Sequence, residues 1–198
     1  MSRGRVLAGI VIGATAVALG WALMASVSRV LRTPAPPPAE AAPTPPQATA
    51  PAIPAVPRIK ATLYFASEHA IGLVPVEQEI PLAEGTVGQA RALVEAQLNA
   101  TPAAPLIPVI PAGTKLRGLF VSARNEAFVD LDTTVRDKHP GGSMNELFTV
   151  FAIVNVITTN LRDVQGVQIL IDGREADTLA GHVDLRRPLR KNEGLITP

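Results

Sequence analysis

An uncharged, apolar run near its start constrains this chain more than any other feature. Residues 6–28 contain no Asp, Glu, Lys or Arg. As a helix rising about 1.5 Å per residue, the run would be about 35 Å long, enough to cross a hydrocarbon core of roughly 30 Å. Trp21 lies toward its end, where an indole suits the membrane interface. We therefore expect residues 1–32 to form one transmembrane anchor.

A cleaved signal peptide is the alternative for this segment. The apolar region of a signal peptide usually has about 7–15 residues and ends in a small-x-small cleavage motif. Here the apolar run is longer, Ser26-Val27-Ser28 is a poor cleavage motif, and two arginines follow directly. The sequence therefore favours an uncleaved, single-pass anchor in the cell membrane.

The charges on the two sides of the anchor are nearly balanced. Arg3 and Arg5 precede it, and Arg29 and Arg32 follow it. The N-terminal amino group adds one positive charge to the first side, and long segments translocate largely regardless of charge. We expect the N-terminus to lie in the cytoplasm and the C-terminal domain to be periplasmic or otherwise extracytoplasmic.

Residues 33–57 are rich in proline and alanine. Ten of the 25 residues are proline, and Glu40 carries the only charge. Proline lacks an amide donor and fixes φ, so neither a helix nor a sheet can run through the segment. It is predicted to be a disordered, semi-rigid linker with a reach of at most about 75–80 Å, at ~3.1 Å per residue.

Residues 58–198 carry the patterns of a folded domain. Alternating apolar and polar residues are typical of half-buried strands. The predicted strands are 59–66, 73–80, 115–122, 127–131 and 167–171, the last ending at the turn Asp172-Gly173. Pro75 indicates an edge position for the second strand, because proline cannot donate to a ladder. The third and fourth strands form a hairpin.

Two helices are predicted between the strand pairs. The first opens at Gly85-Thr86 with Thr86 as its cap, and its buried face is Val87, Ala90, Val94 and Leu98. The second runs from Ser143 to about Asn160, and Ser143 and Glu146 have the S-x-x-E spacing of a capping box. This helix is apolar on nearly all sides, which is typical of a central core element.

The resulting order, β-β-α-β-β-α-β, places the domain in the α/β (α+β) class. Strand pairs separated by helices predict a two-layer sandwich, with helices on one face of a mixed, mostly antiparallel sheet.

Composition and charge exclude several functions. The chain has no cysteine, so it has no disulfides, no thiolate zinc site, no cysteine nucleophile and no lipoprotein lipid anchor. Its net charge is +1, and from Arg58 onward acidic residues slightly outnumber basic ones. A nucleic-acid partner is therefore not expected.

Candidate catalytic and metal sites are weak. Ser143, His182 and Asp172 could be imagined as a triad, but Ser143 is needed as a cap and no G-x-S-x-G elbow surrounds it. His182-x-Asp184 offers only two metal ligands, which do not make a site. We expect no enzymatic activity and no cofactor, and a structural role for His182 in bonding the backbone near the Gly181 turn.

A carboxylate pair is the remaining catalytic candidate. Asp130 and Asp132 lie two residues apart at the end of one predicted strand, where they would share a face and could support acid–base work on glycans. The favoured interpretation is that they are solvated carboxylates at the strand end, or that Asp132 forms a turn.

Two segments are candidate binding surfaces. The proline-interrupted loop 101–111 carries Leu106, Ile107 and Val109, which either dock a partner or fold back over the sheet. The second segment is a basic run that contacts anionic lipid or wall polymer, or else forms a solubilising tail. Its members are Arg186, Arg187, Arg190 and Lys191.

Several stretches resemble the GerMN domain of sporulation, germination and cell-envelope proteins, over residues 60 to about 189. Their order and spacing carry the resemblance. They are 63–65 (LYF), 73–76 (LVPV), 110–116 (IPAGTKL), 127–131 (AFVDL), 142–146 (GSMNE), 152–155 (AIVN), 167–173 (VQILIDG) and 181–184 (GHVD).

The resemblance implies an extracytoplasmic, membrane-tethered domain with no established enzymatic role, similar in architecture to ring-building modules. It implies interaction with envelope proteins or self-assembly. Binding of peptidoglycan, another wall polymer or a small ligand stays open as an alternative. The chain departs from the family pattern in having a predicted helix instead of a lipobox cysteine, a single copy, and the proline-rich loop 101–111.

Overall fold

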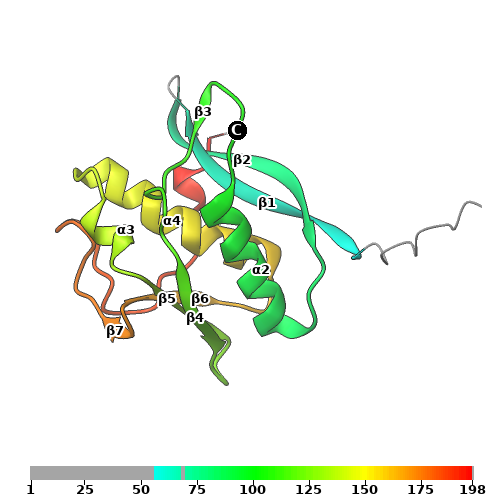
Figure 1. Ribbon diagram of the computed structural model, residues 1–198. Helices are drawn as coiled ribbons and strands as arrows, with labels where there is room; N and C mark the ends of the chain where they lie inside the picture. Colours follow the sequence, from blue (N-terminus) through cyan, green and yellow to red (C-terminus); the bar gives the residue numbers. More distant parts are fainter. Residues whose placement is uncertain (1–55, 68–69, 198) are drawn as a thin grey trace, which may run out of the picture. The chain divides into compact units, whose positions relative to one another are not determined.

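The computed structural model describes residues 56–67 and 70–197 (Figure 1). The predicted anchor and residues 33–55 of the predicted linker lie outside this part of the chain. Among the helices that the structure describes, none is long and apolar enough to span a bilayer.

The described elements follow the predicted order, with short additions. The strands are β1 (Arg58–Ser67), β2 (Ala70–Pro81), β3 (Leu106–Ile107), β4 (Leu116–Val121), β5 (Glu126–Leu131), β6 (Gly166–Ile171) and β7 (Arg174–Glu175). The helices are α2 (Gly85–Asn99), α3 (Thr134–Asp137), α4 (Ser143–Asn160) and the 3-10 turn η1 (Glu193–Leu195). The five predicted strands and both predicted helices are confirmed. β3, β7, α3 and η1 were missed because two to four residues are too short to show a hydropathy period.

The strands form two sheets, so the prediction of one sheet is wrong. One sheet has the order β2-β1-β3 and the other β4-β5-β6-β7. The pairing is mixed and mostly antiparallel, as predicted, with β5 and β6 running parallel. Pro75 lies in β2, which is at an edge of its sheet as predicted.

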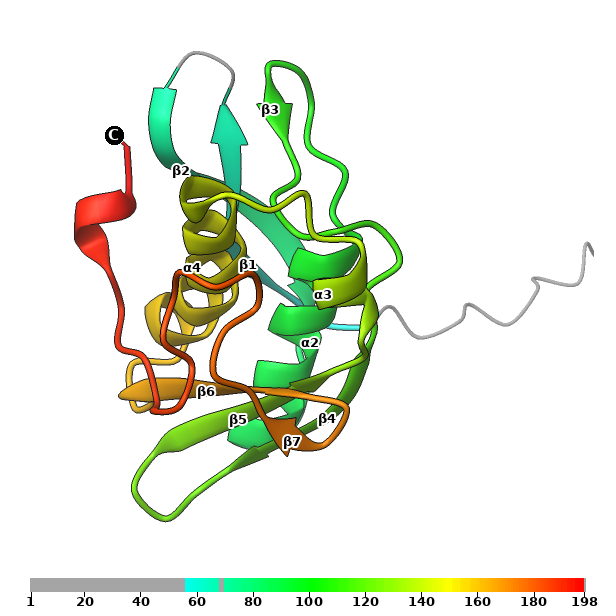
Figure 2. The ribbon, with the colours of Figure 1, turned by 90° about the vertical axis from the view of Figure 1, so that its left-hand side faces the viewer.

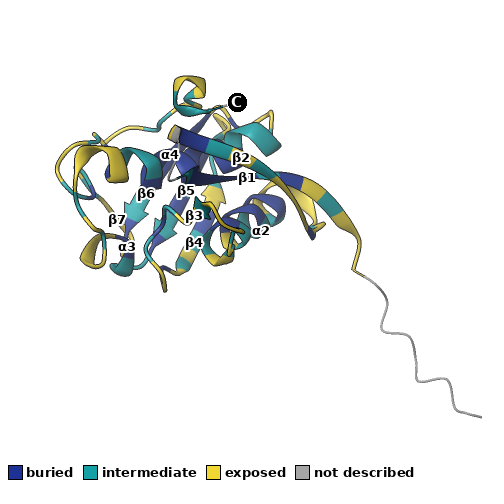
Figure 3. Ribbon diagram, turned by 90° about the horizontal axis from the view of Figure 1, so that it is seen from above, coloured by how far each residue is buried: buried dark blue, intermediate teal, exposed yellow. Residues whose placement is uncertain are grey.

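Helices α2 and α4 lie between the two sheets (Figures 1 and 2). α2 contacts β1, β2 and β4, while α4 contacts β1, β2 and β6. The helices need a sheet on each side because α4 is apolar nearly all round. Every residue of α4 from 149 to 157 is buried. A helix that is buried on all sides cannot be covered by one sheet on one face. Figure 3 shows this burial in dark blue on α4 and β1.

The start and the buried face of α2 differ from the prediction. Glu84 is the N-cap, no side chain caps the helix, and Thr86 lies inside the first turn. Val87 is 43% exposed. The buried positions are Gln89, Ala90, Leu93, Val94 and Gln97. Two glutamines therefore lie on the buried side of α2. Because they are polar, the hydropathy pattern did not show the full buried face.

One of these glutamines, Gln97, hydrogen-bonds to the backbone at one edge of β1. Gln97 pairs with both backbone groups of Tyr64: its Oε1 accepts from the Tyr64 N–H at 2.8 Å, and its Nε2 donates to the Tyr64 carbonyl at 2.8 Å. Asn160 of α4 binds Thr62 in the same way, with both distances 2.9 Å. Further along, β3 pairs with Ala66 and Ser67. Side-chain amides and a short strand thus satisfy the edge of β1 that faces away from β2.

The Gln97 interaction yields a stability prediction. Gln97→Leu keeps the side-chain volume but leaves two buried backbone groups of Tyr64 without partners, which should cost about 2–4 kcal/mol. The matched control is Gln78→Leu on the exposed side of β2, which should change stability by no more than about 0.5 kcal/mol. Urea denaturation of both variants measures the difference, and equal stabilities would contradict the role given to Gln97.

Candidate functional site

A buried carboxylate joins the start of α4 to the segment that follows β7. Glu146 is completely buried. Its Oε1 accepts from the N–H groups of Leu179 and Ala180 at 2.9 and 3.0 Å. Its Oε2 accepts from the N–H of His182 at 2.8 Å and lies 3.0 Å from the ring Nδ1 of the same residue. One side chain therefore orders a stretch that has no helix or strand of its own.

The environment of Glu146 favours the charged form. Burial by itself raises the pKa of this carboxyl, but hydrogen bonds from the backbone of Ala180, His182 and Val183 and from the His182 ring bring the pKa below its ordinary value. Its place in the first turn of α4 also favours a negative charge.

Two sequence predictions are corrected at this point. Ser143 and Glu146 do not form a capping box: the N-cap is Gly142, whose φ of 85° turns the chain so that Ser143 is already helical. The carboxylate of Glu146 binds the segment after β7 instead of the helix start. His182 does have a structural contact near Gly181, but its ring binds Glu146 and not the backbone.

The turn at Asp172-Gly173 is confirmed. Both residues have positive φ, 54° and 75°, as a two-residue hairpin loop between β6 and β7 requires. Asp130 Oδ1 accepts from the Gly173 N–H at 2.7 Å. Arg117 of β4 forms ion pairs with both Asp130 and Asp172. The charges of Arg117, Asp130 and Asp172 therefore stabilise this turn.

Asp130 and Asp132 are not arranged as an acid–base pair. Asp130 binds the Gly173 turn, whereas Asp132 accepts from the Lys115 N–H at 2.9 Å and from the Thr134 hydroxyl at 2.8 Å. Both carboxylates thus have local structural partners, in keeping with the favoured reading of the sequence.

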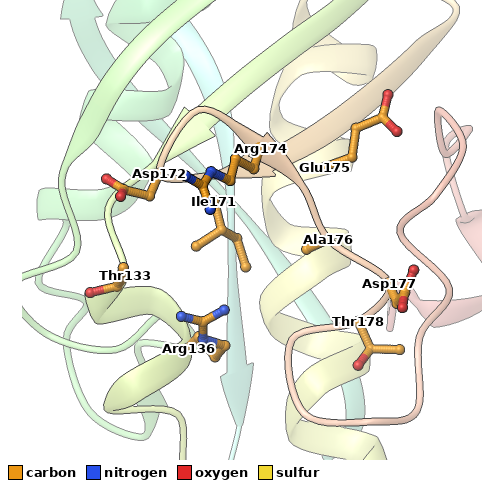
Figure 4. A pocket seen from close by; sticks show the side chains of 9 residues that line it. All are labelled: Thr133, Arg136, Ile171, Asp172, Arg174, Glu175, Ala176, Asp177 and Thr178. Atoms are coloured by element: carbon orange, nitrogen blue, oxygen red, sulfur yellow. The ribbon is translucent and has the colours of Figure 1, made fainter.

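A surface pocket of about 320 Å³ lies beside the same turn (Figure 4). Arg136 of α3 reaches up toward Ile171, and Asp177 and Thr178 form the opposite wall. The complete lining is Thr133, Arg136, Ile171, Asp172, Arg174, Glu175, Ala176, Asp177 and Thr178. Two arginines and three carboxylates nearly cancel, so the lining has little net charge.

The structure divides the predicted basic run into two pairs. Arg186 binds Asp184 through two hydrogen bonds of 2.9 and 2.8 Å, and this pairing lowers the pKa of the Asp184 carboxyl. Lys191 lies 3.0 Å from Glu193. Arg187 and Arg190 form no ion pair within the part of the chain that the structure describes. They line a second pocket of about 280 Å³, with Arg124, Glu126, Gln165, Gly166 and Pro188.

The predicted loop 101–111 has both a buried and an exposed part. Leu106 and Val109 pack against the core, and the carbonyl of Val109 accepts from the Thr149 hydroxyl at 2.5 Å. Ile107 is 44% exposed. Of the three candidate interface residues, Ile107 has the most open side chain, while the other two fold back over the core.

Sequence reasoning missed two contributors to these surfaces. Arg124 lies far from the basic run along the chain, and no spacing signal connects them. Ile71 of β2 is 92% exposed, although the alternation starting at residue 73 gave no reason to examine it. Ser143, His182 and Asp172 are not brought together as a triad, because Ser143 is at the helix start, His182 binds Glu146 and Asp172 pairs with Arg117.

Two solved structures with a similar fold come from a sporulation protein. The first GerMN domain of the sporulation protein GerM from Bacillus subtilis matches with a TM-score of 0.52 and 17% identity, covering 67% of this chain and 97% of that one. The tandem GerMN domains of the same protein match with a TM-score of 0.52 and 18% identity, covering 65% of this chain and 44% of that one. The fold is therefore that of a GerMN domain.

The family model named Germane, described as sporulation and spore germination, matches residues 62–177. The chain belongs to this family, as its resemblance to the GerMN domain predicted. No curated protein matches the chain.

The Glu146 contacts predict a pH-dependent stability. Glu146→Gln leaves one oxygen and an NH₂ group facing several N–H donors, which should cost about 2–4 kcal/mol at pH 7. Because the folded-state pKa is lowered, the stabilisation is complete above the unfolded value of about 4.3 and is lost as pH falls through the folded pKa. The difference between native protein and variant should therefore shrink as pH falls below about 4.

Urea denaturation at pH 7 and pH 3 measures this effect. Glu175→Gln is the control, because that carboxylate is exposed and forms no ion pair among the described residues. A difference between the native protein and Glu146→Gln that is the same at both pH values would contradict the charged role of Glu146.

Proposed function

We propose that the protein is a non-enzymatic, membrane-tethered module of the cell envelope that binds a partner protein or further copies of itself. One observation carries the proposal: Ile71 and Ile107, 92% and 44% exposed, lie at the same end of the sheet β2-β1-β3. Large apolar side chains that are exposed together mark contact surfaces.

The strand register places these two residues. β3 pairs with the end of β1, where Ile107 is opposite Ala66, and on the other side of β1 Ala66 is opposite Leu73. Ile71 is two residues from Leu73 on β2. Figure 2 shows the ends of β1, β2 and β3 side by side. The proposed contact surface, Ile71 and Ile107, thus projects from one end of the domain.

The proposed tether comes from the sequence. Residues 1–32 would anchor the chain with the N-terminus in the cytoplasm, and residues 33–57 would hold the domain outside, away from the bilayer. The family is one of sporulation and germination proteins, and membership supports an envelope role of this kind.

The absence of catalysis is also part of the proposal. The acidic side chains that sequence or geometry would nominate are engaged elsewhere: Glu146 with backbone N–H groups, Asp132 with Lys115 and Thr134, and Asp184 with Arg186. These contacts support structural roles for all three carboxylates.

A second function, binding of a wall polymer, is favoured by a separate observation. Arg187 and Arg190 lack ion-pair partners in the described part of the chain and line a pocket together with Arg124. This pocket is on a different sheet from the proposed contact surface, so one molecule can have both functions.

Site-specific photocrosslinking in living cells tests the protein-binding proposal. A photoreactive residue at position 107 should give a defined crosslinked product, and Ile71→Ser in the same chain should reduce its yield about threefold or more, because apolar contact area is lost. A photoreactive residue at Val87, which is 43% exposed on α2, is the matched control. Equal products from positions 107 and 87, or no effect of Ile71→Ser, would contradict the proposal.

A further inference from the structure

The segment that carries Arg187 and Arg190 is fixed on the second sheet and is not a free tail. Val167 of β6 and Leu189 exchange two backbone hydrogen bonds, each 2.8 Å long. Gln168 Nε2 donates to the Leu185 carbonyl at 2.5 Å. Pro188 lies against Gly166, where an added Cβ would be 3.3 Å from the proline Cβ. The backbone on both sides of Pro188 is therefore ordered before any ligand binds.

Three guanidinium groups line the pocket formed there. Arg124 comes from the β4–β5 turn, and Arg187 and Arg190 come from the fixed segment. Glu126 is the one carboxylate in the lining, and its Oε2 lies 3.2 Å from Arg124 Nε. The pocket thus has an excess of two positive charges in a domain that is slightly acidic as a whole. Guanidinium groups bind carboxylate and phosphate oxygens through paired N–H donors.

A partly exposed aromatic pair lies next to this pocket on the same face of the sheet. Along β5, Ala127, Val129 and Leu131 are buried, so Glu126 and Phe128 are successive residues of the outer face. Two residues along a strand are separated by about 7 Å. Phe128 stacks on Phe120 of β4 with ring centroids 4.5 Å apart and an interplanar angle of 4°. Phe120 is 52% exposed.

This combination of groups fits an anionic glycan. The C–H face of a sugar ring is apolar and packs well on an aromatic ring, while an acidic substituent on the same or the next sugar needs cationic donors a few ångströms away. A free small anion would need no aromatic neighbour. A flat anionic membrane would need a broad basic surface, but the adjacent Arg186 and Lys191 are already paired with acidic residues.

We propose that Arg124, Arg187 and Arg190 bind a phosphate or carboxylate group of a cell-wall glycan, and that Phe120 packs against a neighbouring sugar ring. The inference rests on the second proposed function and assigns residues to it.

Co-sedimentation of the full-length protein with purified peptidoglycan tests this assignment. Arg187→Gln with Arg190→Gln should weaken binding about tenfold, because two charge-assisted contacts are lost. Arg186→Gln with Lys191→Gln removes the same net charge from paired side chains and should leave binding within about twofold of native. Added salt should weaken native binding. Circular dichroism and the denaturation midpoint confirm that each variant is folded.

A second pair of variants tests the aromatic contribution. Phe120→Ser should weaken binding several-fold, whereas Val87→Ser, also a change of an exposed apolar side chain but on α2, should not. Peptidoglycan stripped of phosphate-containing polymers distinguishes the two oxyanions: lost binding indicates phosphate, and retained binding indicates carboxylate.

The outcomes separate the assignment from the function it rests on. If native protein and the Arg187 and Arg190 variant sediment equally, wall binding stands and the pocket assignment is overturned. If native protein does not sediment with peptidoglycan, both are overturned. Binding to phosphatidylglycerol vesicles in place of peptidoglycan would overturn the glycan assignment and indicate a lipid headgroup.

Discussion

The described domain depends on one buried carboxylate, that of Glu146. A fully buried charge is costly unless donors surround it, and here the backbone of Leu179, Ala180 and His182 provides them. These residues lie in a stretch without helix or strand. The carboxylate therefore accepts the backbone hydrogen bonds that a helix or sheet would otherwise accept. The chain then continues to Leu185 and Leu189, which bond to β6. Arg187 and Arg190, which line the arginine pocket, lie at the end of this ordered segment.

The burial of Glu146 follows from the place of α4. This helix contacts both sheets, and residues 149–157 are buried without interruption. A helix covered on all sides brings its polar residues into the interior as well, so each of these needs a partner. Asn155 exchanges hydrogen bonds with Asn192, and Thr149 donates to Val109. Through these contacts α4 also positions the C-terminal segment and loop 101–111, which carry Arg187, Arg190 and Ile107 of the two proposed binding surfaces.

The sequence predicted the elements better than their arrangement. Alternation and apolar periodicity identified five strands and two helices, because those patterns report which sides of an element are buried. The apolar surface of α4 already indicated cover on more than one side, yet the element order alone favoured a single sheet. Contacts between distant residues were not predictable: Glu146 has the spacing of a capping residue, and only the fold brings it to residues 179–182. For the same reason Arg124 could not be joined to Arg187 and Arg190.

The two proposed binding surfaces lie on different sheets, so the domain can hold a protein partner and a wall glycan at once. The glycan-binding proposal requires the segment after β7 to be ordered in solution, because that segment carries Arg187 and Arg190. Native-state hydrogen exchange measures this most directly. The amides of Leu179, Ala180 and His182 should exchange far more slowly than that of Ala123, which has no hydrogen-bond acceptor in the described structure. Exchange of all four amides at similar, rapid rates would contradict the claim that Glu146 orders this part of the chain.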